Sequence, residues 1–583
     1  MELEAYWGIG PKTREALESS IGTEAAIGAI ESGDVRTLAE AGVDRSRVTR
    51  VLRHAHSAEG MALLATRDAR LVYKGLLETI ASHAVSEAAA DRLRTLTPLI
   101  DRGEMNTRLD AVERGQSGWD ALDDDARVAV LDAFERYDDA PDGRLAAVET
   151  AVELADIGVS SAVFDPIDDL DTEALADAAV ALDALGEDRI DRGADEELDR
   201  LRDAREAVDR RASNADAVLE ELRSGGVEDT AAFREGLVEL LREETTIDAS
   251  RVRSAMAQDA VDATGFVLET LRSLRTELDE SIDRRAEQVR AQLELAIDAA
   301  GEDVDRAGPA VTTVARELSL GRFAAAYDLE RPAYVDGEGL AVVGARNLSM
   351  LDGGAEIQPI TYAIGDHGID APVGERVTVL TGANSGGKTT LLETLCEIAI
   401  LAHMGLPVAA DAAELSTLDR LVFHRRHASF NAGVLESTLQ SVVPPLVSGD
   451  RTLMLVDEFE AITEPGRAAD LLGGLVRLTI TEGAIGTFVT HLANDLEPLP
   501  QTARIDGIFA KGLTDDLELE VDYQPRFGAV GRSTPEFIVS RLVANADDRA
   551  EEAGFRTLAK AVDTEVVQRT LSDAAWTALA SDE

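Results

Sequence analysis

The stretch Gly382-Ala383-Asn384-Ser385-Gly386-Gly387-Lys388-Thr389 decides the fold class of the C-terminal half of this 583-residue chain. It has the spacing G-x-x-x-x-G-K-[ST] of a phosphate-binding P-loop, and Thr390 directly after it is assigned to the same site. A strand-like run at 377–380 precedes the loop and a helical pattern at 390–400 follows it. Glycines let backbone N–H groups wrap phosphates, Lys388 reaches the β- and γ-phosphates, and Thr389 offers a hydroxyl to Mg²⁺. The motif therefore predicts a site for ATP and Mg²⁺.

Two later strands are predicted to complete this site. The apolar run 453–456 ends at Asp457 and Glu458. We expect Asp457 to bind the metal with Thr389, and Glu458 to polarise the attacking water. The run 486–490 ends at His491, at the strand tip where α/β sheets bind ligands, so His491 is predicted to contact the γ-phosphate. Solvated acids after a strand and a structural histidine remain the alternatives.

The chain divides into regions of different pattern. Residues 331–545 alternate strand-like runs, such as 359–364 and 376–380, with helices, which predicts an α/β domain. Residues 58–330 are predicted to form a helical core. In it, the stretches 198–222 and 268–297 carry apolar residues at three-four spacing, as in long packed helices. A break at 224–226 separates them, so we expect lever helices with a clamp tip. A helical tail is predicted at 546–583.

Residues 1–57 are predicted to form a helix–hairpin–helix DNA-binding module. The turn Gly8-Ile9-Gly10-Pro11-Lys12-Thr13 resembles that motif closely, and a second turn at 41–44 resembles it more weakly. Such a turn opens a helix whose backbone N–H groups can hold a phosphate. A basic run follows, and its members are also assigned to DNA binding: Arg45, Arg47, Arg50 and Arg53. Two ordinary helix starts are the alternative.

The formal net charge of −54 is spread along the whole chain. Lys is scarce, and Arg supplies almost all of the positive charge, which favours adaptation to molar salt over acidity that serves a basic partner. The single Cys396 argues against a disulfide framework or a thiol metal cluster. The N-terminus carries no signal-peptide pattern, and the longest apolar stretch, 396–410, is too short to span a bilayer. We therefore expect a halophilic, cytoplasmic protein with no membrane association.

Several of these motifs together resemble the MutS family of DNA mismatch-repair-type ATPases. The run 381–390 is similar to the MutS P-loop, and 418–423 to the run that leads into the MutS signature loop. Thr490-His491 resembles the Thr-His after the third strand of the MutS ATPase. Residues 314–318, followed by 324–326, resemble the end of the MutS lever helices. The resemblance covers about residues 190–540 and is specific in the ATPase.

The resemblance implies a multidomain protein whose C-terminal domain is an ABC-like α/β P-loop ATPase, placed after an all-α lever and clamp body. It also implies a homodimer in which the signature loop of one subunit completes the ATP site of the other. The candidates for that role are Ser429, Asn431 and Gly433. No Leu-Ser-Gly-Gly-Gln motif precedes Asp457, which separates the chain from transporter ATPases.

The chain also departs from the mismatch-repair pattern. The one Phe-x-Glu found, at 233–235, lies in a helical stretch, where we expect Phe233 to pack inward rather than to stack on a mispaired base. No His-Gly-x-Gly nuclease motif is found, and no nuclease activity is predicted. The chain thus resembles an archaeal branch without the mismatch-reading and nuclease domains. The leading hypothesis is an ATP-gated dimeric clamp that binds DNA non-specifically. A mismatch or junction sensor in repair or recombination and a chromosome-organising structural ATPase remain alternatives.

Overall fold

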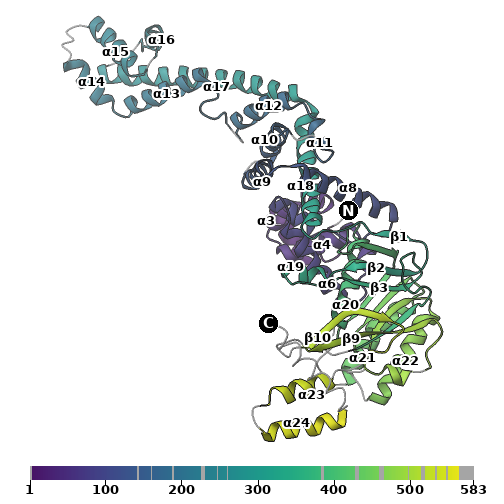
Figure 1. Cartoon of the computed structure of the whole chain (residues 1–583). Helices are drawn as coiled ribbons and strands as arrows, with labels where there is room; N and C mark the ends of the chain where they lie inside the picture. The colour runs from purple at the N-terminus through teal and green to yellow at the C-terminus, as the bar shows by residue number, and fades with distance from the viewer. Residues whose placement is uncertain are drawn as a thin grey trace. The chain divides into compact units, whose positions relative to one another are not determined.

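The computed structural model is mostly helical and contains two mixed sheets (Figure 1). It describes residues 3–140, 143–158, 161–186, 189–224, 230–245, 247–258, 260, 262–382, 387–426, 432–458, 465–496, 498–513, 519–531, 535–546 and 549–562. The chain forms two compact units. Unit 1 comprises Met1–Arg127, Ser161–Val163 and Val314–Glu583, and unit 2 comprises Val128–Ser160 and Phe164–Thr313. In this described part, no helix is both long and apolar enough to cross a bilayer.

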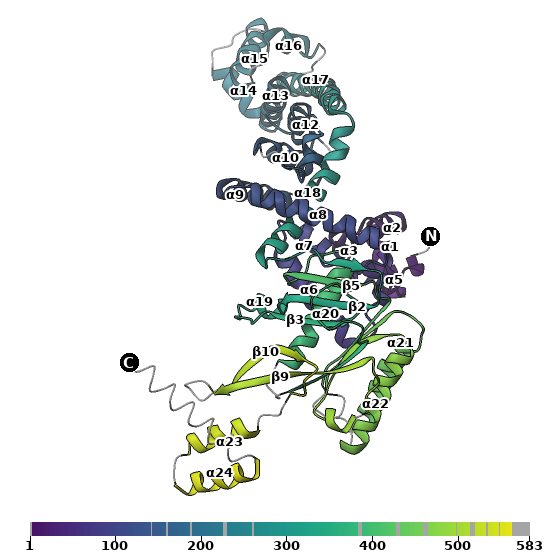
Figure 2. The same cartoon turned by 45° about the vertical axis from the view of Figure 1, so that its right-hand side comes forward.

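The larger sheet of unit 1 has six strands in the order β10-β9-β4-β8-β7-β6. Figure 2 shows its outer hairpin, β9 and β10. Its strands are β4 (Val377–Gly382), β6 (Arg420–His424), β7 (Thr452–Val456), β8 (Ile485–Val489), β9 (Ala503–Leu513) and β10 (Leu519–Phe527). All neighbours are parallel except β10, which is antiparallel to β9. The central strands are nearly continuous apolar runs, as expected where both faces of a parallel sheet are covered. Parallel pairing brings the carboxyl ends of β4, β7 and β8 to one edge.

Helix α20 (Lys388–His403) starts at that edge and is almost wholly buried. Its leucines and isoleucines share one hydrophobic core with both sheets and with α6 (Arg67–Ser82). The smaller sheet has the order β1-β5-β2-β3. Its strands are β1 (Ala333–Val335), β2 (Gly339–Ala345), β3 (Ile360–Gly365) and β5 (Ala412–Ser416), and the short α19 (Leu348–Asp352) follows β2. A second core joins the larger sheet to α21 (Ala432–Leu446) and α22 (Pro465–Thr481).

The N-terminal helices of unit 1 have a core of their own. They are α1 (Pro11–Ser20), α2 (Thr23–Ser32), α3 (Val35–Glu40) and α4 (Arg45–His56). Leu17, Ile30 and Leu52 are fully buried among them. The chain continues through α5 (Ala58–Ala62), α6, α7 (Glu87–Leu93) and α8 (Arg102–Ala121). After β10, α23 (Pro535–Ala544) and α24 (Arg549–Val562) pack on each other.

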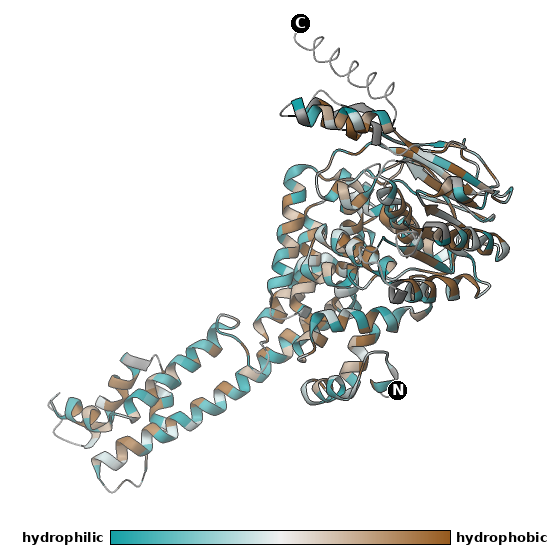
Figure 3. Cartoon of the chain, turned by 90° about the horizontal axis from the view of Figure 1, so that it is seen from below, coloured by the Kyte–Doolittle hydropathy of each residue, from teal (hydrophilic) through white to brown (hydrophobic). Residues whose placement is uncertain are grey.

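Unit 2 is helical and is built around the long α17 (Ala263–Ala300). Its other helices are α10 (Gly143–Asp156), α11 (Asp165–Asp168), α12 (Thr172–Ala184), α13 (Glu196–Ala212), α14 (Ala215–Ser224), α15 (Thr230–Thr245) and α16 (Ala249–Ser254). Helices α9 (Asp124–Asp139) and α18 (Glu302–Ala326) lead into and out of it. Ion pairs Arg285–Asp195 at 2.6 Å and Arg205–Asp279 at 3.1 Å show that α13 and α17 run antiparallel. Figure 3 shows the hydrophilic and hydrophobic residues that alternate along these helices.

The apolar pattern over 198–222 predicts one long helix, but the structure divides it into α13 and α14. The break falls at Ser213 and Asn214, two residue types that compete for backbone hydrogen bonds and favour helix ends. Ser213 Oγ donates to the Asp209 carbonyl, and the Asn214 carbonyl accepts the first bond of α14, from Ala217 N. Phe233 is half-buried and packs against Phe266, as the sequence predicts for a residue in a packed helix.

The last residue of α20, His403, ties the P-loop helix to the approach of β6. Its Nδ1 donates to the Ala399 carbonyl at 2.7 Å, and its Nε2 accepts from Leu418 N at 2.8 Å. The Leu418 bond requires a neutral ring. Burial lowers the pKa of His403 from 6.5 to about 4. A group with a depressed folded-state pKa stabilises the fold above its unfolded pKa and loses that contribution as the pH falls through the folded value.

We therefore expect the free energy of unfolding to fall by up to about 3 kcal/mol between pH 6.5 and 4 on account of His403. A His403→Gln variant lacks this titration, although it is less stable at pH 7. Equilibrium denaturation of both proteins across this range should show the difference between them narrowing as the pH falls. A difference that stays constant would contradict the role given to the neutral ring.

Candidate functional site

The two glycines that bound the P-loop occupy positions where a side chain cannot fit. Gly382 ends β4 with φ 133°, and a Cβ there would lie 2.4 Å from the Ile508 carbonyl oxygen. Gly387 precedes α20 with φ 73°, and a Cβ there would lie 2.8 Å from Cδ1 of Tyr523. Both backbone conformations favour glycine. The assigned loop residues between them lie outside the described residues: Ala383, Asn384, Ser385 and Gly386.

The first residues of α20 point toward both ends of the site. Lys388 is buried, and its Nζ donates to the Gly382 carbonyl at 2.9 Å, across the base of the loop. Thr389 Oγ1 donates to Asp457 Oδ2 at 2.7 Å. The structure thus brings together the lysine, threonine and aspartate that the sequence assigns to phosphate and metal.

Asp457 presents a carboxylate suited to a cation. It follows β7 and is buried, and burial raises its pKa while the Thr389 hydrogen bond opposes that rise. Its second oxygen, Oδ1, is buried and has no hydrogen-bond partner among the residues that the structure describes. A buried carboxylate oxygen without a partner is costly, and a metal ion satisfies it. Thr389 and Asp457, a hydroxyl and a carboxylate, are oxygen donors of the kind that Mg²⁺ prefers.

Glu458 is held in a left-handed backbone conformation, φ 38°, which is uncommon outside glycine and concentrates at functional sites. Its Oε1 lies 2.8 Å from His491 Nε2, and its Oε2 lies 2.6 Å from Arg426 Nη1. The hydrogen bond from His491 is the main cause that lowers the pKa of Glu458, and the Arg426 charge adds to it. The carboxylate is therefore ionised at neutral pH, and both of its oxygens are engaged.

A cavity of about 250 Å³ opens beside the P-loop helix. Thr390, Asn347 and Gln358 supply polar atoms to its wall, and Leu391 and Tyr523 supply apolar surface. Tyr523 lies on β10 and reaches the base of the loop at Gly387. An aromatic ring next to a phosphate loop is suited to cover a nucleotide base.

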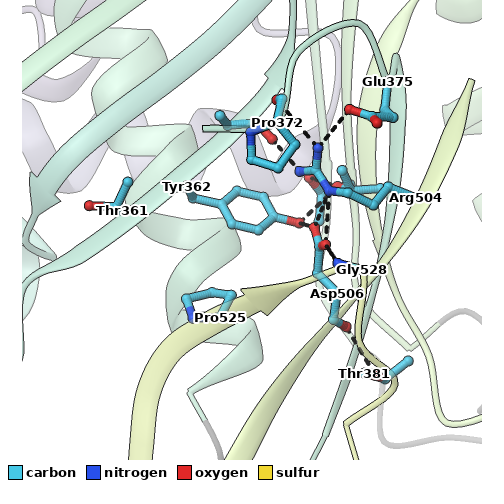
Figure 4. A network of polar contacts seen from close by, with 12 residues as sticks. Thr361, Tyr362, Pro372, Glu375, Thr381, Arg504, Asp506, Pro525 and Gly528 are labelled. Atoms are coloured by element: carbon cyan, nitrogen blue, oxygen red, sulfur yellow. Dashed lines mark hydrogen bonds and ion pairs between the residues drawn. The ribbon is translucent and has the colours of Figure 1, made fainter. Parts of the chain in front are cut away.

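A buried polar network holds the strand that carries the P-loop against its neighbours (Figure 4). Arg504 on β9 donates to Asp506 at 2.9 Å and to Glu375 at 2.9 Å. Asp506 also accepts from Tyr362 on β3 at 3.1 Å and from Gly528 N at 3.0 Å. Burial raises the pKa of Asp506, and Arg504 counters that rise. Arg504 and Asp506 therefore form a buried ion pair in which both side chains make further hydrogen bonds.

The network reaches the P-loop through Thr381, the residue before Gly382. Thr381 Oγ1 donates to the Asp506 carbonyl at 3.0 Å and accepts from Gly531 N at 2.6 Å. A Cβ at Gly531 would lie 2.8 Å from the Cα of Gly382. The segment after β10 is thus packed directly on the start of the loop.

The residues assigned to the trans signature loop are not brought into this site by the described part of the chain. Ser429 and Asn431 lie outside the described residues, and Gly433 falls in the first turn of α21. Their assignment stays a prediction.

The two N-terminal turns differ in their helix starts. Gly8 has φ 85°, and α1 begins after Gly10 with no side-chain cap on its first turn. Thr13 is buried and Lys12 is exposed. At the second turn, the Asp44 side chain accepts from Ser46 N and Arg47 N, at 3.0 and 3.3 Å. The carboxylate of Asp44 thus occupies N–H groups at the start of α4. In the first turn of α1, Pro11 has no N–H and Thr13 N donates to the Gly10 carbonyl at 3.0 Å, so neither helix start offers a full set of N–H groups to a phosphate.

The four assigned arginines have different surroundings. Arg47 donates to the Gly8 carbonyl at 3.2 Å and so joins the two turns. Arg53 is half-buried, donates to the Arg94 carbonyl at 2.8 Å and lies over the Tyr73 ring. Arg45 and Arg50 are exposed on α4.

Sequence reasoning missed Arg426 and Tyr523. Arg426 comes two residues after β6, the parallel neighbour of β7. Its place at the same sheet edge as Glu458 was the available signal. Tyr523 lies more than 130 residues from Gly387 and carried no local signal.

Sequence comparison finds several related proteins. The chain is 44% identical over 218 residues to the DNA-binding protein MutS2 of Pyrococcus furiosus, which covers 37% of this chain and 38% of that one. It is 28% identical over 560 residues to the DNA mismatch repair protein MutS of Natronomonas pharaonis, covering 86% and 60%. It is 29% identical over 273 residues to the DNA mismatch repair protein MutS 2 of Halobacterium salinarum, covering 43% and 29%.

The chain is thus similar to curated MutS and MutS2 proteins, which supports a MutS-family assignment. The MutS resemblance of the sequence motifs is thereby confirmed. No family model matches the chain. The matches span less than two thirds of the length of each of these MutS relatives.

Lys388→Ala should weaken binding of an ATP analogue at least tenfold, because the phosphates lose a buried charge contact that is worth more than about 1.4 kcal/mol. Fluorescence titration with a labelled nucleotide measures this affinity. Lys560→Ala, which removes an exposed lysine on α24, is the control and should bind normally. Equal affinity of the two variants would show that Lys388 does not face the phosphates.

Proposed function

We propose that the chain is a MutS-type ATPase that hydrolyses ATP with Mg²⁺ and couples this to DNA binding. The observation that carries the ATPase proposal is the Thr389–Asp457 hydrogen bond beside the unpartnered Asp457 oxygen and the His491-bound Glu458. A metal ion, a phosphate loop and a carboxylate base are the parts that phosphoryl transfer to water requires.

Each residue has a separate proposed role. When bound, Mg²⁺ neutralises charge on the phosphates, and Thr389 and Asp457 hold it. Lys388 places its ammonium against the β- and γ-phosphates. His491 fixes one oxygen of Glu458, so that the other can accept a proton from the attacking water once Arg426 releases it. The lowered pKa of Glu458 keeps it ionised for this task.

The domain layout is part of the proposal. In it, residues 1–57 are a DNA-binding module, 58–330 a helical body with lever helices and tip, 331–545 the ATPase domain and 546–583 a C-terminal tail, in which α24 is the described helix. The DNA-binding residues are those of the first turn and of α4, and their contacts to phosphates are independent of base sequence. Its MutS relatives support DNA as the partner, because one is named a DNA-binding protein and others mismatch repair proteins.

A homodimer completes the mechanism that we propose. Ser429, Asn431 and Gly433 of one subunit would contact the nucleotide of the other, so that ATP closes the pair around DNA. Hydrolysis then opens it. Such a clamp needs no contact with bases, and no nuclease activity is proposed.

Glu458→Ala should lower ATP hydrolysis by about 10²- to 10⁴-fold, because the water loses its base. Binding of ATP should stay within a few fold, since Lys388 and Thr389 remain. Steady-state phosphate release and nucleotide titration measure the two effects separately. Glu482→Ala, an exposed carboxylate after α22, is the matched control. Hydrolysis at the normal rate in Glu458→Ala would show that Asp457 and Glu458 are misassigned.

The clamp proposal predicts topological retention of DNA. Between 50 and 200 mM salt, six to ten phosphate contacts lose about 10³–10⁵ in affinity, so an electrostatic grip fails in concentrated KCl. A closed ring holds DNA without such contacts. With Glu458→Ala protein and ATP in high KCl, dissociation from circular duplex should be much slower than from linear duplex of the same sequence. Equal dissociation rates would exclude a closed clamp.

A further inference from the structure

A groove of about 810 Å³ lies between α4 and the helices α6 and α7 of unit 1. Six of the residues that line it are Arg or Lys, and only two, Glu78 and Asp91, are acidic. This composition is the reverse of the chain as a whole, in which Asp and Glu number 111 and Lys and Arg 57. A local reversal of charge on so acidic a protein marks a surface that meets an anion.

The two acids do not cancel this charge. Arg94 pairs with both, at 3.0 Å to Glu78 and 3.2 Å to Asp91. Arg50 and Lys74 are exposed at the groove, and neither forms an ion pair with a carboxylate within the described residues. Arg70 donates to the Leu64 carbonyl at 3.0 Å, which leaves its charge uncompensated.

His54 reports the same field. Burial is the first cause that lowers its pKa, and the charges of Arg70, Arg50 and Arg53 lower it further. Protonation of His54 is therefore opposed by burial and by the positive charges around it. An anion that enters the groove is attracted by the same charges.

The groove also offers aromatic and apolar surface. Trp7 lies at its side with 53% of its surface exposed, and its ring stacks on His54 with centroids 3.8 Å apart. Tyr73 and Met61 line the floor. Arg53 is fixed over the Tyr73 ring and on the Arg94 carbonyl, so it stiffens the wall. An exposed tryptophan of this kind loses little conformational freedom when a flat ligand stacks on it.

The exposed cations Arg50 and Lys74 and the aromatic surface of Trp7 together determine which ligand fits the groove. Phosphates of any nucleic acid can bind Arg50 and Lys74, but the faces of a base inside a duplex are covered by its neighbours. Only an unpaired base can expose a face to Trp7. We propose that this groove binds an unpaired segment of DNA, with its phosphates at Arg50 and Lys74 and a base stacked on Trp7. The proposal deepens the DNA-binding function proposed above and rests on it.

Binding of an oligothymidylate, with no ATP present, tests the proposal on the full-length protein. Its affinity should fall roughly 10- to 100-fold in Trp7→Ala, because stacking of one base is lost. Trp7→Phe should restore most of the affinity, which separates stacking from support of the module. Binding should quench tryptophan fluorescence in the unsubstituted protein and much less in Trp7→Phe.

The double variant Arg50→Gln, Lys74→Gln tests the phosphate contacts proposed for these two exposed cations of the groove. The slope of log K against log [KCl] for the single strand should decrease in magnitude by about 1.4, or 0.7 for each phosphate contact. The control pair is Arg36→Gln, Lys560→Gln, which removes the same two residue types at exposed positions outside the groove. Basal ATPase should be unchanged in the control pair.

Blunt duplex of equal length and an oligouridylate distinguish the outcomes. If Trp7→Ala loses affinity for the oligothymidylate but keeps its affinity for the duplex, the proposal that the groove binds unpaired DNA is supported. If Trp7→Ala and Trp7→Phe both lose single-strand and duplex binding to the same extent, the groove proposal is overturned while the proposed DNA binding stands. Tighter binding of the oligouridylate than of the oligothymidylate has the same consequence. Failure of the unsubstituted protein to bind any DNA overturns both proposals.

Discussion

The hydrogen bond from Thr389 Oγ1 to Asp457 Oδ2 depends on a constraint that governs the whole of unit 1: three parallel strands must end at one edge. Strand β8 lies between β4 and β7 and is parallel to both, so the three strands end at the same edge. His491 follows the end of β8 and therefore lies at that edge as well. The nearly complete burial of α20 then fixes Lys388 and Thr389 over that edge. The P-loop motif provides Lys388 and Thr389, and the parallel sheet brings Asp457 and His491 close to them.

The local parts of this arrangement could be predicted from sequence, because each lies in a few consecutive residues. The P-loop glycines, the acidic pair after β7 and the histidine after β8 are of this kind. Tyr523 and Gly531 could not be predicted, since their roles depend on contacts with residues far away in the chain. The split of the expected helix 198–222 was visible in Ser213 and Asn214, but an uninterrupted apolar pattern outweighed it. The cap on α4 was also visible in Asp44, which stands where an N-cap is expected.

The charge of the chain and a role in DNA binding are compatible once distance is considered. At about 1 M salt the screening length is about 3 Å, so carboxylates elsewhere on the surface exert almost no force on a bound strand. Only groups in contact with the ligand matter, and at the groove beside α4 those groups are mainly basic. Screening also weakens the phosphate contacts themselves, which raises the relative value of stacking on Trp7, an interaction that depends little on salt. An acidic protein in concentrated salt therefore gains more from an aromatic surface than from further arginines.

The start of the P-loop is packed against the segment that follows β10. A side chain at Gly382 would collide with the Ile508 carbonyl, and one at Gly531 would collide with the backbone of Gly382. Thr381, held by Asp506 and by Gly531 N, fixes the strand end behind it. A shift of the loop on nucleotide binding must therefore move the segment 528–531 or break its bond to Thr381, because close-packed backbone does not yield by compression.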